Sequence, residues 1–127
     1  MKRSIALLPL LILLASCAGI TPGNDPVVVN AERSTVVAVD VFDTFTKWEY
    51  DNRKACAAFP EIRESADRIR TGGPDWLASA RHLTQAYKQN RTPENKANLA
   101  TAIALLRAAM VEANDYLPVE QQKKLPK

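Results

Sequence analysis

Apolar residues recur at steps of three and four along residues 31–70, the spacing that gathers side chains on one face of an α-helix. Two series that each repeat every seven residues carry this pattern. They are Ala31, Ala38, Phe45, Asn52, Phe59 and Ala66, and Ser34, Val41, Trp48, Ala55, Ile62 and Ile69. The charged residues from Lys47 to Lys54 fall outside both series. The pattern predicts a helix from about residue 31, capped by Asn30, to about residue 70.

Pro60 interrupts this helix without shifting its register. Because proline removes one backbone hydrogen bond, it should either kink the helix near Cys56 or begin a second helix as its first residue. Gly72 and Gly73 are predicted to end the element, since glycine readily adopts the left-handed conformation that follows a helix. Pro74 would then open the next helix.

Two further helices are predicted before Pro118. The first runs from Pro74 to about Asn90, and the second begins at Pro93 with Thr92 as its N-cap. Their apolar faces are Trp76, Leu77, Ala80, Leu83 and Tyr87, and Leu99, Ile103, Leu106, Met110, Ala113 and Leu117. A short connection makes these helices antiparallel neighbours. The sequence therefore predicts an all-α fold, a small helical bundle of three helices, or four if Pro60 breaks the first.

The segments on either side of the bundle differ from it in composition. Residues 18–29 are rich in glycine, proline, asparagine and aspartate, so residues 17–29 are interpreted as a tether. Residues 30–117 form the predicted bundle domain. Residues 118–127 are polar and basic, and we expect them to fray as a flexible tail.

The amino terminus has the organisation of a secretory signal peptide. Lys2 and Arg3 precede an almost unbroken apolar run from Ile5 to Leu14. The run is shorter than the roughly 20 residues that span a bilayer as a helix, so a permanent transmembrane anchor is not expected. Small residues follow, and then a cysteine, in the order Leu14-Ala15-Ser16-Cys17.

This four-residue motif resembles the lipobox of bacterial lipoproteins. The resemblance implies that residues 1–16 are removed and that Cys17 carries a diacylglyceryl group on its sulfur, often with an acyl chain such as palmitate on its amine. Two or three acyl chains give stable membrane anchoring, which a single chain does not. Ala18 replaces the aspartate that commonly retains such proteins in the inner membrane of enteric bacteria, which favours the outer membrane, facing the periplasm. The alternative is an ordinary secreted protein with a chance cysteine.

The net charge of the mature chain does not point to a particular class of partner. The chain has 17 Lys and Arg against 14 Asp and Glu, and Lys2 and Arg3 leave with the signal peptide, so the mature side chains are almost neutral. Nucleic-acid binding needs clustered positive charge, so nucleic acid is not an expected partner.

Few residues suggest catalysis or metal binding. Cys56 is the second of two cysteines, and a buried thiol is favoured over an intermolecular bridge because alanines and Phe59 surround it. His82 is the single histidine, and one histidine with one cysteine does not make a usual metal site. No cofactor other than the lipid on Cys17 is expected.

Two carboxylates allow a weaker hypothesis of cell-wall hydrolysis. Glu49 and Asp51 flank Tyr50 and could act as an acid and base pair. Side chains two residues apart point in different directions on a helix, so a solvated face is the favoured interpretation. Asn52 interrupts the apolar series, where a polar residue can fix the register of helix packing or mark the rim of a kink.

Lys127 invites comparison with one lipoprotein family. A lipid-anchored helical chain that ends in lysine is similar in outline to the major outer-membrane lipoprotein, which is joined to peptidoglycan through its C-terminal lysine. That family is a single uninterrupted coiled-coil helix, whereas this chain has prolines and a predicted helical hairpin. Wall attachment is thus an alternative to an ordinary basic tail.

We interpret the chain as a lipid-anchored envelope protein of a Gram-negative bacterium or prophage that acts by binding. The partner would be another envelope protein or a second copy. Aromatic side chains dominate binding hot spots, so the candidates for partner binding are Trp48, Tyr50, Trp76 and Tyr116, although core packing is favoured for both tryptophans. The alternatives are a prophage-type lysis or exclusion lipoprotein and the cell-wall hydrolase.

Overall fold

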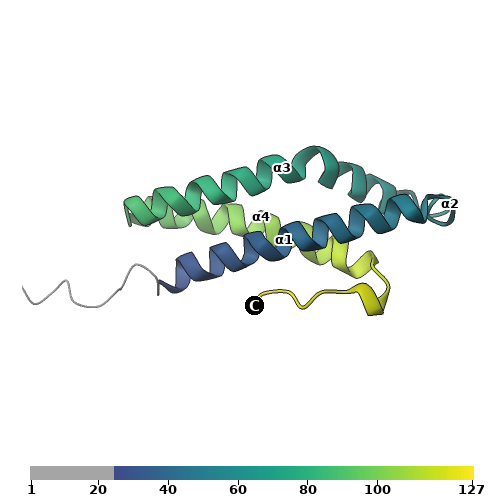
Figure 1. The fold of residues 1–127 in the computed structure, drawn as a ribbon. Helices are drawn as coiled ribbons and strands as arrows, with labels where there is room; N and C mark the ends of the chain where they lie inside the picture. The colour runs from purple at the N-terminus through teal and green to yellow at the C-terminus, as the bar shows by residue number, and fades with distance from the viewer. Residues whose placement is uncertain (1–24) are drawn as a thin grey trace, which may run out of the picture.

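Three long helices pack against one another in the computed structural model, which describes residues 25–127. The helices are α1 (Pro26–Asp51), α3 (Pro60–Gln89) and α4 (Pro93–Tyr116), with a single-turn helix α2 (Arg53–Cys56) and a 3₁₀ helix η1 (Val119–Gln121). Each long helix contacts the other two, and α3 and α4 form an antiparallel hairpin beside α1 (Figure 1). The all-α bundle predicted from the sequence is confirmed.

The core follows the predicted apolar positions closely. All six predicted positions of α4, the last of which is its C-cap Leu117, are buried, and the predicted α1 positions from Ala31 to Phe45 are buried as well. The seven-residue series fails where the chain leaves the helix, because Asn52, Ala55 and Phe59 are exposed. There the backbone turns from α1 through α2 into α3, so helical spacing no longer decides which side chains face the core.

The first helix begins earlier than the sequence pattern indicated. Asp25, not Asn30, is its N-cap: the Asp25 carboxylate accepts a 2.9 Å hydrogen bond from the Val27 amide, and Pro26 is the first helical residue. Residues 26–29 are therefore helical rather than part of a tether. Val28 is buried against the bundle, and this burial explains why the helix extends to the proline.

Pro60 begins a helix instead of kinking one, the second of the two alternatives. Asn52 ends α1: its backbone amide and its side-chain amide both donate to the Trp48 carbonyl, at 3.0 and 2.8 Å. Asn52 is exposed, so it acts at the helix end and does not fix a register within the core.

The prediction that Gly72 and Gly73 end a helix is wrong, because α3 continues through both glycines and through Pro74 to Gln89. No residue of the described chain has a positive φ. Gly73 is buried where α3 faces Phe42 of α1, and an added Cβ would lie in ordinary van der Waals contact with the Phe42 ring, at 3.6 Å. Pro74 cannot donate to the Arg70 carbonyl, and α3 bends along its length (Figure 1).

The connection at residues 90–92 is as predicted. The Thr92 hydroxyl accepts a hydrogen bond of 3.1 Å from the Asn95 amide, and Pro93 is the first residue of α4. Arg91 lies 3.3 Å from the Asp25 carboxylate, so the hairpin turn sits beside the start of α1. The break at residues 52–59 forms the opposite end of the bundle (Figure 1).

The C-terminal segment is docked, which corrects the expectation of a frayed tail. The Asn114 side chain exchanges two hydrogen bonds with the Lys123 backbone, at 2.7 and 3.2 Å, and Lys123 also lies 3.2 Å from Asp40. Leu125 packs against the core. Residues 118–127 thus run back along the bundle, as Figure 1 shows, because buried Asn114 supplies the partners their backbone needs.

Candidate functional site

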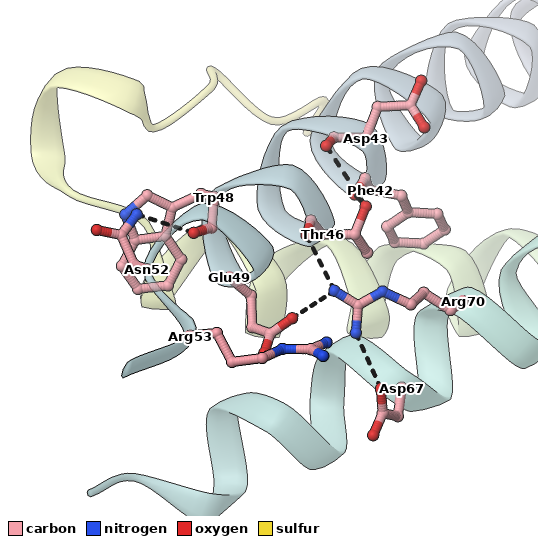
Figure 2. A network of polar contacts seen from close by, with 9 residues as sticks. All are labelled: Phe42, Asp43, Thr46, Trp48, Glu49, Asn52, Arg53, Asp67 and Arg70. Atoms are coloured by element: carbon pink, nitrogen blue, oxygen red, sulfur yellow. Dashed lines mark hydrogen bonds and ion pairs between the residues drawn. The ribbon is translucent and has the colours of Figure 1, made fainter. Parts of the chain in front are cut away.

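A buried carboxylate, Glu49, lies at the centre of the main polar network. Its side chain is fully buried on α1 and pairs with Arg70 of α3 (Figure 2). Arg70 also donates to the Thr46 carbonyl at 3.0 Å and to Asp67 at 2.9 Å. The Arg53 Nε lies 3.5 Å from the second Glu49 oxygen. Two arginines therefore neutralise one carboxylate between α1 and α3.

The electrostatics of this network favour permanent charge on Arg70. Burial acts to lower the pKa of Arg70, but hydrogen bonds and charges from Glu49 and Asp67 outweigh it and raise the pKa. Without such a partner, burying the charged carboxylate would lower the stability of the fold by several kcal/mol. The network thus holds α1 against α3 and leaves Glu49 no solvent-exposed surface.

The structure keeps Glu49 and Asp51 apart, in agreement with the prediction from their spacing. Asp51 is exposed and forms a 2.6 Å ion pair with Lys47 on its own helix. The expectation that both carboxylates occupy a solvated face is nevertheless wrong for Glu49. The missed signal was local: Phe42, Phe45 and Glu49 lie at steps of three and four, and both phenylalanines are buried. Glu49 is thus fully buried while Asp51 is exposed, and the hydrolase hypothesis stays a prediction.

Cys56 is a buried free thiol, which confirms the favoured interpretation. Desolvation raises its pKa above the usual value, and the negative charge of Glu49 raises it further. The neutral thiol is therefore the stable form, and its nucleophilicity is low.

His82 is exposed on α3. Within residues 25–127, no group of three or more histidine, cysteine or acidic side chains could hold a metal ion. In the same range, none of the helices has the length and apolar character needed to cross a membrane.

The four aromatic candidates do not form one surface. Trp48 and Tyr116 are half-buried and stack on Phe45 with ring centroids 6.3 and 5.9 Å away. Trp76 is half-buried beside Phe42 in an edge-on arrangement. Tyr50 is 66% exposed at the end of the bundle formed by residues 52–59. Its ring lies 5.3 Å from the Arg53 guanidinium. Their role in partner binding stays a prediction.

Lys127 lies beside the first turns of α1. Arg107 donates from one guanidinium nitrogen to the Lys127 backbone oxygen at 3.0 Å and to the Asn30 side chain at 2.8 Å. The Lys127 residue itself is exposed. Wall attachment through Lys127 stays a prediction, and Cys17 and the rest of the lipobox lie outside the described residues.

Comparisons of this chain with protein-family models, with curated proteins and with solved structures found no match.

Proposed function

We propose that the protein is a lipid-anchored, periplasm-facing envelope protein that acts as a helical binding and structural module, with another envelope protein or a second copy as its partner. The observation that carries this proposal is the motif Leu14-Ala15-Ser16-Cys17, placed directly after a positively charged start and an apolar run. A cysteine at the cleavage position provides the sulfur for the diacylglyceryl group, and two or three acyl chains hold a protein stably on a membrane.

The start of α1 supports a short attachment to the membrane. Eight residue steps separate Cys17 from Asp25, and covalent geometry limits their separation to about 29 Å. Asp25 caps α1, and its ion pair with Arg91 joins this end to the α3–α4 turn. The bundle would therefore be anchored at the Asp25 end, with the break at residues 52–59 directed toward the periplasm.

The environment of the reactive groups supports binding rather than catalysis. Glu49 has its charge neutralised by Arg70 and Arg53 inside the protein, and Cys56 is buried with a raised pKa. Both side chains are buried, whereas a catalytic group needs access to its substrate.

The test is to fractionate cells that produce the wild-type protein, Cys17→Ala or Cys56→Ala, after growth with a clickable palmitate analogue. We expect the wild-type protein and Cys56→Ala to be labelled, to reach the outer membrane and to dissolve in detergent. Cys17→Ala should lack the label and keep its signal peptide. A wild-type protein that is unlabelled and water-soluble would overturn the proposal.

The same envelope fractions, boiled in detergent, test Lys127. If the wild-type protein stays on the wall until the wall is digested while Lys127→Ala is released, covalent wall attachment replaces simple lipid anchoring.

A further inference from the structure

The outward face of α4 carries no charge along four turns. Every exposed residue of α4 between Lys96 and Glu112 is apolar or uncharged: Ala97, Asn98, Ala100, Thr101, Ala104, Leu105, Ala108 and Val111. Leu105 and Val111 are 49% and 48% exposed. The Thr101 hydroxyl is already bonded to the Ala97 carbonyl at 3.0 Å, so it does not depend on water. We call these eight residues the α4 face.

The outer faces of the other two long helices are different. Exposed positions on α1 include Glu32, Arg33, Asp40, Asp43 and Lys47, and those on α3 include charged residues from Glu61 to Arg81. Charge at such positions keeps a helix surface hydrated. The α4 face therefore differs from them: it is uncharged and mostly apolar, and no other segment of residues 25–127 covers it, which is typical of an interaction site.

We propose that the α4 face packs against the α4 face of a second copy of this chain, with the two α4 helices parallel. The inner residues of such a pair are Ala97, Thr101, Ala104, Ala108 and Val111, which follow one another at alternating steps of four and three. In a parallel pair each meets its own counterpart, and the alanines let the two backbones approach closely.

Charge complementarity selects the parallel direction. In a parallel pair, the residue that precedes an inner position such as Ala108 lies beside the residue five places later on the other helix, which here follows the inner residue Val111. Arg107 and Glu112 have this spacing, so each copy would offer its arginine to the other's glutamate. An antiparallel pair would instead bring Arg107 near Ala100, and Glu112 near Asn98, with no opposite charge to meet. Glu94 and Asp115 would face their own counterparts and limit the contact to residues 97–111.

Arg107 is available for such a pair. Arg107 is partly exposed, and among residues 25–127 its guanidinium donates to the side chains of Asn30 and Ser34 and to the Lys127 backbone oxygen, but to no Asp or Glu side chain. Glu112 is partly exposed and holds Arg68 at 2.6 Å, and a carboxylate can accept from two arginines. Each copy thus presents one arginine that pairs with no Asp or Glu side chain of the described residues and one carboxylate that can accept a further hydrogen bond.

Membrane anchoring would also favour parallel α4 helices. This support rests on the proposed function, whereas the charge complementarity does not. The Arg91–Asp25 pair places the start of α4 at the anchored end. Two copies on one membrane would therefore stand with α4 pointing the same way. The contact covers about 21 Å of helix, which is short for a stable dimer in solution. Confinement to a membrane raises the effective concentration and favours the pair.

The test is cysteine cross-linking of the full-length protein in native membranes. Ala97→Cys, Ala104→Cys and Val111→Cys replace inner residues, and Ala78→Cys, exposed on α3, is the matched control. With a short thiol cross-linker we expect each of the three to give covalent dimers at roughly ten times the yield of the control, because each inner residue faces its own counterpart across helix axes about 8–10 Å apart. Yields no higher than that of Ala78→Cys would overturn the proposal.

A mixed experiment tests the direction. Differently tagged Ala97→Cys and Val111→Cys proteins, produced together, should not cross-link to each other in a parallel pair. If this mixed dimer forms while Ala97→Cys alone gives none, the helices are antiparallel and the proposal fails.

Charge exchange tests the predicted pair in the Ala104→Cys background. Arg107→Glu and Glu112→Arg should each reduce the dimer yield about threefold, as expected for a partly exposed ion pair, and the double variant should restore it. A double variant no better than either single variant would contradict this pairing. Fractionating the same samples separates the two proposals: an anchored protein that does not cross-link overturns only the dimer, and a soluble protein that does cross-link overturns only the anchor.

Discussion

Glu49 is a charged residue whose position in the core depends on two arginines. Arg70 approaches from α3 and Arg53 from α2, and the carboxylate between them is fully buried. Removing one partner of a buried ion pair leaves the other charge without water or a counterion. The loss of stability should therefore be larger than for an ion pair on the surface. The Arg68–Glu112 pair, in which both side chains are at least 40% exposed, provides the comparison.

We expect Arg70→Met to lower the free energy of unfolding by about 2 kcal/mol, less than for a fully buried pair because the Arg70 side chain is 31% exposed. Arg68→Met should cost less than about 1 kcal/mol. Urea denaturation of a protein that consists of residues 25–127 measures both. Adding Glu49→Gln to Arg70→Met should recover part of the loss, because no buried charge then remains. Equal losses for the two arginine variants would contradict the structural role of Glu49.

The raised pKa of the Cys56 thiol predicts that the stability of the protein depends on pH. Desolvation and then the charge of Glu49 raise the pKa of the folded thiol above its ordinary value of 9.0. The folded state therefore keeps the proton more strongly than the unfolded state. The resulting stability is complete below pH 9.0 and is lost as the pH rises through the folded pKa.

Wild-type protein should thus lose more stability than Cys56→Ala between pH 8 and pH 10.5, measured by urea denaturation at each pH. All other side chains are the same in the two proteins, so only the difference between their curves reports on Cys56. Parallel curves would show that the thiol makes no contribution.

At the scale of the elements, the sequence located helices better than it located their ends. The apolar stripe of α4 was predicted residue by residue, because helical spacing and burial agree along its whole length. Gly72, Gly73 and Pro74 were misinterpreted as a boundary, since their local preferences favour a turn. The contact of Gly73 with Phe42 depends on how α1 and α3 pack, and a single-sequence pattern does not contain that information.

The two glycines of α3 should respond differently to alanine. A Cβ on Gly73 would make ordinary contact with Ile69 and Phe42 at 3.6 Å, so Gly73→Ala should stabilise the helix by about 0.5–1 kcal/mol. A Cβ on Gly72 would lie 2.7 Å from the Trp76 ring, which packs against Phe42 and would have to move. We therefore expect a higher Tm for Gly73→Ala and a lower one for Gly72→Ala, measured by circular dichroism. The reverse order would contradict this account of α3.

At the scale of the whole molecule, the sequence predicted the bundle and its antiparallel hairpin, but not the docked tail or the buried network. The composition of residues 118–127 favours solvent, yet Asn114 binds the backbone at Lys123. Arg70 reaches Glu49 only because α3 folds back on α1. Both features join residues distant along the chain or on separate elements, whereas sequence patterns report chiefly on neighbours within one helix.

The molecule has two ends with different expected environments, and their distances from the membrane can be measured. With α1 about 39 Å long from its 26 residues, the two ends of the bundle are well separated. The tether from Cys17 keeps Asp25 within about 29 Å of the lipid anchor. Asn90 lies at the Asp25 end, through the Arg91–Asp25 pair, and Ala57 lies in the break at the other end.

A fluorophore on Asn90→Cys should therefore be quenched by spin-labelled lipid headgroups more strongly than one on Ala57→Cys, in vesicles that carry the lipidated protein. Lengthening the tether with about 20 glycine and serine residues should reduce the difference, because a flexible linker of that length reaches beyond its native span. Equal quenching at both sites with the native tether would mean that the bundle lies flat on the membrane. That orientation would contradict an upright bundle. The parallel direction of the two α4 helices would then rest on the spacing of Arg107 and Glu112 alone.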